Sequence, residues 1–214
     1  MRYIALLFFL LTSISGIAAE TPNIPPARPP YYSISVPYTH TPTNKTSQLR
    51  FVLWLPQNVK TVRAVLIRHH GCLTSSVQSS ITSAYDLHWQ ALAQKHECAI
   101  LVPPSLLHTN NDCFACSDPS HGSEATLSRA LDSLGTLTNH PEIATTPWIL
   151  WGTETGATWT QGILQLNPKR VTAAYLHPTP NSKSVIVPRD TASFVQKANG
   201  LPLLIHLTDA EDDV

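Results

Sequence analysis

Short, wholly apolar runs limit this chain to a small number of folds. Such runs occupy residues 64–67, 98–102 and 148–151. Runs of this length suit strands that are buried on both faces of a sheet. Helix-like spacing of apolar residues follows or separates them, at residues 80–96, 123–137 and 155–166. Strands that alternate with helices of this length predict an α/β fold with a mostly parallel, doubly wound sheet.

Weaker patterns complete the expected order of elements. Further strands are predicted at residues 49–55, 171–176 and 201–207, with a short helix at 191–197. The clearest helix is expected at 123–137, where Ser123 can cap the first turn. One apolar stripe runs along it, made of Leu127, Ala130, Leu131, Leu134 and Leu137. In a sheet of this kind ligands bind beyond the carboxyl ends of the strands, so the residues after each strand are the candidates for a site.

The first 30 residues are predicted to lie outside the folded domain. Residues 1–19 combine Arg2, an apolar run too short to span a bilayer and small residues around Ala18 and Ala19, which is typical of a signal peptide. An uncleaved anchor is the alternative. Residues 20–30 are proline-rich and are expected to form an extended leader. A single domain is predicted at 31–214, in a protein that is secreted or periplasmic and has no further membrane segment.

Charge excludes one class of partner. Lys and Arg together number 14, as do Asp and Glu, so the formal net charge is zero. Nucleic-acid-binding proteins normally carry a basic excess, and we therefore expect no nucleic-acid partner.

Export favours oxidised cysteines over metal-bound ones. The disulfide candidates are Cys72, Cys98, Cys113 and Cys116. Four cysteines allow three pairings, and the sequence leaves all of them open. A zinc site at the C-x-x-C of Cys113 and Cys116 is disfavoured because no second C-x-x-C accompanies it. We expect neither a metal nor a cofactor.

A strand-to-helix turn carries the main chemical motif. After the apolar run at 148–151 comes Gly152-Thr153-Glu154-Thr155-Gly156, and the helical pattern follows at once. Two glycines four residues apart at such a turn are typical of a nucleophile elbow. The central residue takes a strained conformation there, and the glycines let helix and strand approach closely.

Several segments around this turn resemble the α/β-hydrolase superfamily, and most closely its exported esterases and polyhydroxyalkanoate-depolymerase-like members. They are Arg63-Ala64-Val65-Leu66-Ile67-Arg68-His69-His70-Gly71-Cys72, Tyr85-Asp86-Leu87-His88-Trp89-Gln90-Ala91-Leu92-Ala93, Cys116-Ser117-Asp118-Pro119 with Ser123, His140-Pro141-Glu142, and Trp148-Ile149-Leu150-Trp151-Gly152. The resemblance implies an ester hydrolase scaffold of the α/β-hydrolase type. It also implies attack by a serine that a histidine activates and an acid orients.

The resemblance places the site residues by position. Glu154 stands where the family carries its serine nucleophile. Asp209 and Asp212 are the candidates for the acid, and the N–H groups of Cys72 and Thr155 for the oxyanion hole. No histidine follows Asp212, so the sequence predicts a domain without the family's last strand, helix and histidine.

These departures predict an esterase-like homologue that is catalytically impaired, although the sequence leaves open whether it is an enzyme. One alternative is a secreted binding protein that holds a small ester or acyl ligand in the retained pocket. The other is a hydrolase in which the Glu154 carboxylate is the nucleophile. Glutamate is one methylene longer than the aspartate of known carboxylate nucleophiles, and a misplacement of about 1 Å can cost about a hundredfold in rate.

Overall fold

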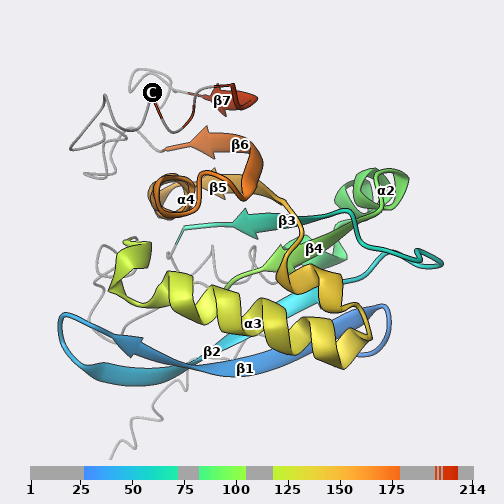
Figure 1. The fold of residues 1–214 in the computed structure, drawn as a ribbon, viewed down its shortest axis with the longest axis horizontal. Coiled ribbons are helices and arrows are strands. Elements are labelled where there is room, and N and C mark those ends of the chain that lie inside the picture. Colours follow the sequence, from blue (N-terminus) through green and yellow to red (C-terminus); the bar gives the residue numbers. More distant parts are fainter. Residues whose placement is uncertain are drawn as a thin grey trace, which may run out of the picture.

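The computed structural model describes residues 27–71, 82–104, 118–178, 196, 198 and 200–206. These residues form one mixed sheet with helices on both faces (Figure 1). The strands are β1 (Tyr31–His40), β2 (Lys45–Trp54), β3 (Ala64–His69), β4 (Cys98–Val102), β5 (Trp148–Thr153), β6 (Val171–His177) and β7 (Leu203–Ile205). The helices are α2 (Leu87–Lys95), α3 (Ser123–Thr138) and α4 (Thr155–Leu166), with short 3₁₀ turns η1 (Ser83–Tyr85), η3 (Pro119–His121) and η4 (Pro141–Ala144).

The sheet is mostly parallel, as the sequence predicts. Its order over the described residues is β1-β2-β4-β3-β5-β6-β7. β1 pairs antiparallel with β2, and β2 antiparallel with β4, whereas every later pair is parallel. The α/β fold class is therefore confirmed. The prediction that the last strand and helix are missing lies outside the described residues.

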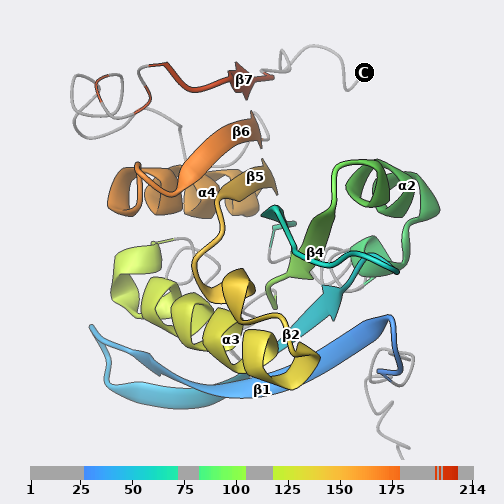
Figure 2. The same cartoon turned by 45° about the vertical axis from the view of Figure 1, so that its right-hand side comes forward.

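Two hydrophobic clusters hold the helices on the sheet. On one face, α3 and α4 pack Leu131 and Ile163 against Ile67 and Leu150. On the other face, α2 and η1 cover Leu66 and Ile100. Figure 2 shows α4 beside β5 and β6, and α2 on the opposite side beside β4. All six residues of β3 are buried, which explains the apolar run at its first four positions, 64–67.

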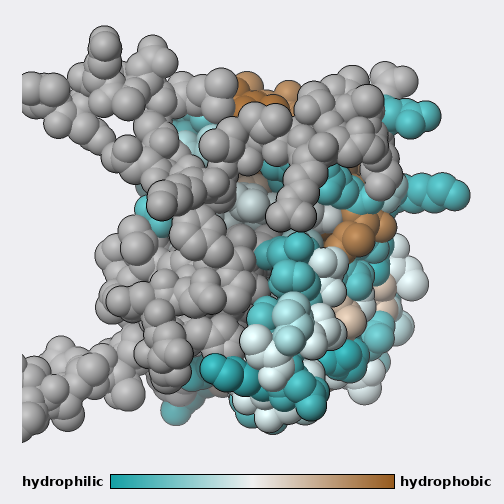
Figure 3. Space-filling model, turned by 90° about the vertical axis from the view of Figure 1, so that its left-hand side faces the viewer, coloured by the Kyte–Doolittle hydropathy of each residue, from teal (hydrophilic) through white to brown (hydrophobic). Residues whose placement is uncertain are grey.

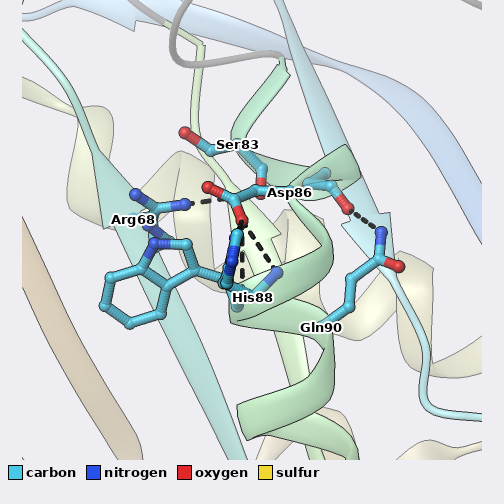
Figure 4. A network of polar contacts seen from close by, with 7 residues as sticks. Arg68, Ser83, Asp86, His88 and Gln90 are labelled. Carbon is cyan, nitrogen blue, oxygen red and sulfur yellow. Dashed lines mark hydrogen bonds and ion pairs between the residues drawn. The ribbon is translucent and has the colours of Figure 1, made fainter.

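Arg68 fixes α2 against the second face. Its guanidinium lies 4.1 Å from the ring centroid of Trp89 and 4.6 Å from that of Trp151. Nη1 donates to the Ser83 carbonyl at 3.4 Å, as Figure 4 shows beside the Asp86 carboxylate that caps α2. Burial lowers the pKa of Arg68 to about 10, and the nearby charge of Asp86 partly opposes that shift. The side chain remains charged at neutral pH and ties three elements together.

Some local predictions are wrong. The helix expected at 80–96 is interrupted at Asp86: the 3₁₀ turn η1 ends at Tyr85, and α2 begins at Leu87, where Asp86 accepts from the N–H groups of His88 and Trp89. Residues 80 and 81 lie outside the described residues. Ser123 does not cap α3. Gly122 takes the cap position at φ 108°, and Ser123 Oγ instead accepts from Trp159 Nε1 at 2.9 Å.

The surface over the described residues is mainly hydrophilic on the face shown in Figure 3, where hydrophobic residues gather in small separate patches. Among the described residues no helix is long and apolar enough to cross a membrane.

Candidate functional site

The turn between β5 and α4 has the strained backbone that the sequence predicts. Glu154 lies there with φ 52° and ψ −130°. Its N–H donates to the His177 carbonyl at 2.8 Å, and its own carbonyl accepts from the Ala157 N–H at 3.0 Å. Non-glycine residues in such conformations cost about 1–3 kcal/mol and persist only where the surrounding structure fixes them. The hydrogen bonds on both sides provide that support.

Close packing explains the two glycines of the turn. A Cβ on Gly152 would lie 2.9 Å from Ala157 Cα, and one on Gly156 would lie 2.7 Å from His69 Nδ1. Real Cβ contacts are essentially never this short. Any other residue at either position would therefore push α4 away from β5 or from the end of β3.

The turn after β3 lies directly against Glu154. A Cβ on Gly71 would lie 2.7 Å from Glu154 Cβ and 3.0 Å from Thr155 Oγ1. The carboxyl ends of β3 and β5 therefore bring the Gly71 backbone to the side chain of Glu154. Thr155 begins α4 beside them. Cys72, the other candidate for the oxyanion hole, lies outside the described residues.

His69 is a buried, neutral imidazole. Its ring stacks on Trp159 with centroids 4.7 Å apart, and its Nδ1 is buried with no hydrogen-bond partner among the described residues. Burial lowers the pKa of His69 to about 4; a hydrogen bond with the His70 backbone opposes that shift in part, and the charge of the His70 side chain adds a smaller lowering. A base with so low a pKa accepts protons poorly at neutral pH.

His70 joins the turn after β3 to two neighbouring elements. Its Nε2 lies 3.0 Å from Ser83 Oγ, and its Nδ1 lies 3.4 Å from Thr153 Oγ1. Burial, and next the positive charge of Arg68, lower the pKa of His70 to about 4. The Ser83–His70 contact brings a hydroxyl to an imidazole, but Ser83 is only 4% exposed. A weak base and a buried hydroxyl fit a structural link rather than a relocated nucleophile.

Two histidines on the same edge are missed by sequence reasoning. His177 ends β6 and His206 follows β7, and their rings stack with centroids 4.5 Å apart. The Tyr175 hydroxyl lies 3.2 Å from His206 Nδ1. The chain order of the resembling family directs the search beyond Asp212 and so passes over both residues. The rule that sites lie beyond the carboxyl ends of strands would have found them.

The remaining predicted site residues lie outside the structure or separate from this edge. Asp209, Asp212, Cys113 and Cys116 are not among the described residues. Cys98 is a buried thiol at the start of β4 that forms no disulfide within the described residues, and its candidate partners Cys72, Cys113 and Cys116 lie outside them. Its Sγ lies 3.4 Å from the His96 carbonyl, and burial raises its pKa. Among the described residues no group of three or more His, Cys, Asp and Glu could hold a metal ion.

Comparison with known proteins shows the fold but no family by sequence. No family model matches this chain, and no curated protein matches it. A poly(3-hydroxybutyrate) depolymerase from Bordetella parapertussis shares 16% identity and a TM-score of 0.51 over 83% of this chain and 66% of its own. The chain thus spans slightly less than two thirds of that structure.

Two further solved structures are similar with lower TM-scores. A cold-adapted esterase from an Arctic intertidal metagenomic library shares 18% identity over 83% of this chain and 71% of its own, with a TM-score of 0.49. A dienelactone hydrolase from Anabaena variabilis shares 16% identity over 83% of this chain and 74% of its own, with a TM-score of 0.48. At these identities the likeness establishes the fold alone, which the depolymerase match identifies as that of the α/β-hydrolases.

Proposed function

We propose that this α/β-hydrolase-fold chain is an esterase-type homologue in which Glu154 has replaced the serine nucleophile, so that ester hydrolysis by the serine route is lost. One observation carries the proposal. Glu154 occupies the strained position between β5 and α4, at φ 52°, where an esterase of this fold presents its hydroxyl. The side chain presented there is a carboxylate, and Gly71 packs against it.

A carboxylate does not substitute for serine in ester hydrolysis. If Glu154 attacked an ester carbonyl, the tetrahedral adduct would hold both the carboxylate and the substrate's alkoxide. The carboxylate is the far weaker base and leaves first, so the adduct returns to the starting ester. His69 and His70, with pKa values of about 4, are neutral imidazoles at pH 7 and so provide no imidazolium to protonate the departing alkoxide.

The direct test uses activated esters and a serine-directed probe. Purified chain should hydrolyse p-nitrophenyl acetate and butyrate no faster than heat-inactivated chain. A fluorophosphonate should leave it unlabelled while labelling an active serine esterase in the same tube. Glu154→Ser alone should gain little activity, since a serine hydroxyl without a general base is a poor nucleophile. Ester turnover in the unchanged chain that is lost in Glu154→Gln would overturn the proposal.

A second candidate is a hydrolase with Glu154 as a carboxylate nucleophile toward carbon–halogen or epoxide bonds. It is favoured by the carboxylate at the turn and by His177 and His206 on the same edge, where imidazole could activate water. In that reaction a carboxylate oxygen would displace halide, or open the epoxide, to form an alkyl ester. Incubation with a haloalkane or styrene oxide, followed by peptide mass spectrometry, would show the alkyl adduct on Glu154.

The same purified chain and small esters distinguish a binding protein from an enzyme. A small ester or acyl ligand that raises the melting temperature but yields no product would favour a binding protein.

We also propose that the protein is exported. The arginine, apolar run and small residues of positions 1–19 support this. Expression with measurement of the intact mass in the periplasmic or extracellular fraction tests it. A mass that retains residues 1–19 in the cytosolic fraction alone would contradict export.

A further inference from the structure

An open groove lies on the side of the molecule opposite α3 and α4, away from Glu154. Its volume is about 440 Å³, and it runs between the start of β1, the end of β2 and one side of α2. The residues that line it include Pro30, Tyr31, Trp54, Leu87, Gln90 and Gln94. Figures 1 and 2 both show the start of β1 on the same side as α2. None of the residues that line the groove carries a charge.

The groove combines apolar surface with a polar handle. Leu87 is 74% exposed and lies beside Pro30, Tyr31 and Trp54, which adds apolar surface to the groove. The Tyr31 ring stacks on Tyr85 at 4.3 Å, which holds it in place. The Tyr31 oxygen accepts from Gln90 Nε2 at 2.8 Å, so the hydroxyl hydrogen can donate to a further acceptor. Fixed aromatic rings with hydrogen-bond donors between them are what proline-rich segments dock against.

We propose that the proline-rich segment of this same chain at residues 21–27 docks into this groove as a polyproline II helix. The segment reads Thr-Pro-Asn-Ile-Pro-Pro-Ala and, like the groove, has no charged side chain. Polyproline II has three residues per turn, so Pro22 and Pro25 share one face, and its carbonyls are left free to accept hydrogen bonds.

The connection to β1 places the segment next to the groove. The Tyr31 N–H donates to the Arg28 carbonyl at 2.6 Å, which closes a β-turn at the point where the chain enters β1. The Leu55 N–H donates to the Pro30 carbonyl at 2.9 Å and fixes the end of that turn on β2. The turn reverses the chain, and two of its residues, Pro30 and Tyr31, line the groove themselves. Seven residues in polyproline II reach about 20 Å, enough to pass along α2.

Docking within one chain needs little affinity. A short tether gives the segment an effective concentration in the millimolar range, so even a weak site stays occupied. Proline also loses little conformational entropy when it is held in an extended form. The docked segment would cover Leu87 and hold the leader on the folded domain.

The test is photo-cross-linking in the full chain. With p-benzoylphenylalanine in place of Ile24, irradiation should give a cross-link within one chain to the peptide that contains α2, with a yield independent of protein concentration. Leu87→Glu should weaken docking about tenfold, because a buried leucine is worth roughly that factor. Leu92→Glu is the matched control, since Leu92 is an exposed leucine of the same helix that does not line the groove.

A second variant guards against an effect of Leu87→Glu on the helix itself. Pro25→Gly with Pro26→Gly leaves the folded domain unchanged and should also lower the yield, because glycine raises the entropy that docking must overcome. Cross-links that fall on another surface, that join two chains, or that survive equally in Leu87→Glu and Leu92→Glu would overturn the proposal.

Discussion

Glu154 combines a backbone conformation that favours glycine with a long acidic side chain. Its φ of 52° suits glycine, while the chain holds a long acidic side chain there. The hydrogen bond that its N–H donates to the His177 carbonyl, and the one that its carbonyl accepts from the Ala157 N–H, hold the backbone of the turn in this conformation. The position therefore tolerates a change of side chain better than a change of the surrounding glycines.

Glu154→Gly should stabilise the protein. Glycine adopts this conformation without the Cβ penalty, and the expected gain in the free energy of unfolding is about 1 kcal/mol. Urea denaturation monitored by circular dichroism measures it. Glu154→Ala is the control, because alanine keeps the Cβ and should give no such gain. If alanine stabilised the protein as much as glycine, backbone strain would not be the cause.

The buried histidines predict a loss of stability in mild acid. Below about pH 6.5 the unfolded chain binds protons at His69 and His70, while the folded chain does not until about pH 4. The unfolded state thus gains protons first, and stability falls as the pH falls through this window. The loss is about 3 kcal/mol for fully buried His69 and smaller for His70, which is partly open to solvent.

Denaturation series between pH 7.5 and pH 4.5 check this. His69→Gln should show a shallower fall than the unchanged chain. His88→Gln should leave the fall unaltered, because the His88 side chain is fully exposed. An equally steep fall in His69→Gln would remove His69 as a cause.

At the scale of elements, the contact between α4 and the end of β3 is the tightest requirement of the site. Gly156→Ala adds a methyl group 2.8 Å from the His69 carbonyl carbon, so strand and helix must separate. We expect destabilisation of about 2 kcal/mol or more, although alanine is the better helix former. Gly135→Ala in α3 is the control, because it is the same substitution within a helix. Its added Cβ would lie no closer than 3.1 Å to a neighbouring atom, so it should destabilise the protein less. Thermal melts of the two variants compare them, and equal losses would count against this explanation.

Most elements could be predicted because their patterns are local. The apolar run at 98–102 coincides with β4, and the helix at 155–166 with α4. β1 escaped prediction, although Val36, Tyr38 and His40 alternate as buried residues. Pro37 argues against a central strand, but β1 lies at the edge of the described sheet, where a missing N–H is tolerated. Whether a strand can contain proline thus depends on its position in the sheet, which no local sequence pattern shows.

The site was predictable only where backbone shape determines it. The spacing of Gly152 and Gly156 indicates the turn at Glu154, because close approach requires glycine. The stack of His177 and His206 depends on the pairing of β6 with β7, which no local sequence pattern indicates. The buried face was predicted for α3, where Leu127, Ala130, Leu131 and Leu134 are buried, but not for α2, whose buried residues are Gln90 and Ala93.

For the whole molecule, β7 gives the described sheet an apolar edge. Leu204 is 61% exposed and Ile205 39% exposed on a strand that pairs with β6 on one side. Exposed edges with apolar side chains promote pairing between molecules. Leu204→Lys should lower self-association, which light scattering over a concentration series measures. Leu137→Lys is the control, because Leu137 is 54% exposed on α3 and belongs to no edge. Self-association that falls equally in both variants would point to general hydrophobicity.

The order of the strands along the chain also affects the order in which contacts form during folding. β1 and β2 are joined by a hairpin and can pair as soon as both are made. The turn at Glu154 depends on β5 lying beside β3, and the contact of His70 with Thr153 joins residues 83 positions apart. Long loops close slowly, and such contacts form late in folding. We therefore expect the pairing of β1 with β2 to precede the assembly of the carboxyl edge of the sheet, so that a newly made chain acquires its first strand pair before it acquires a site.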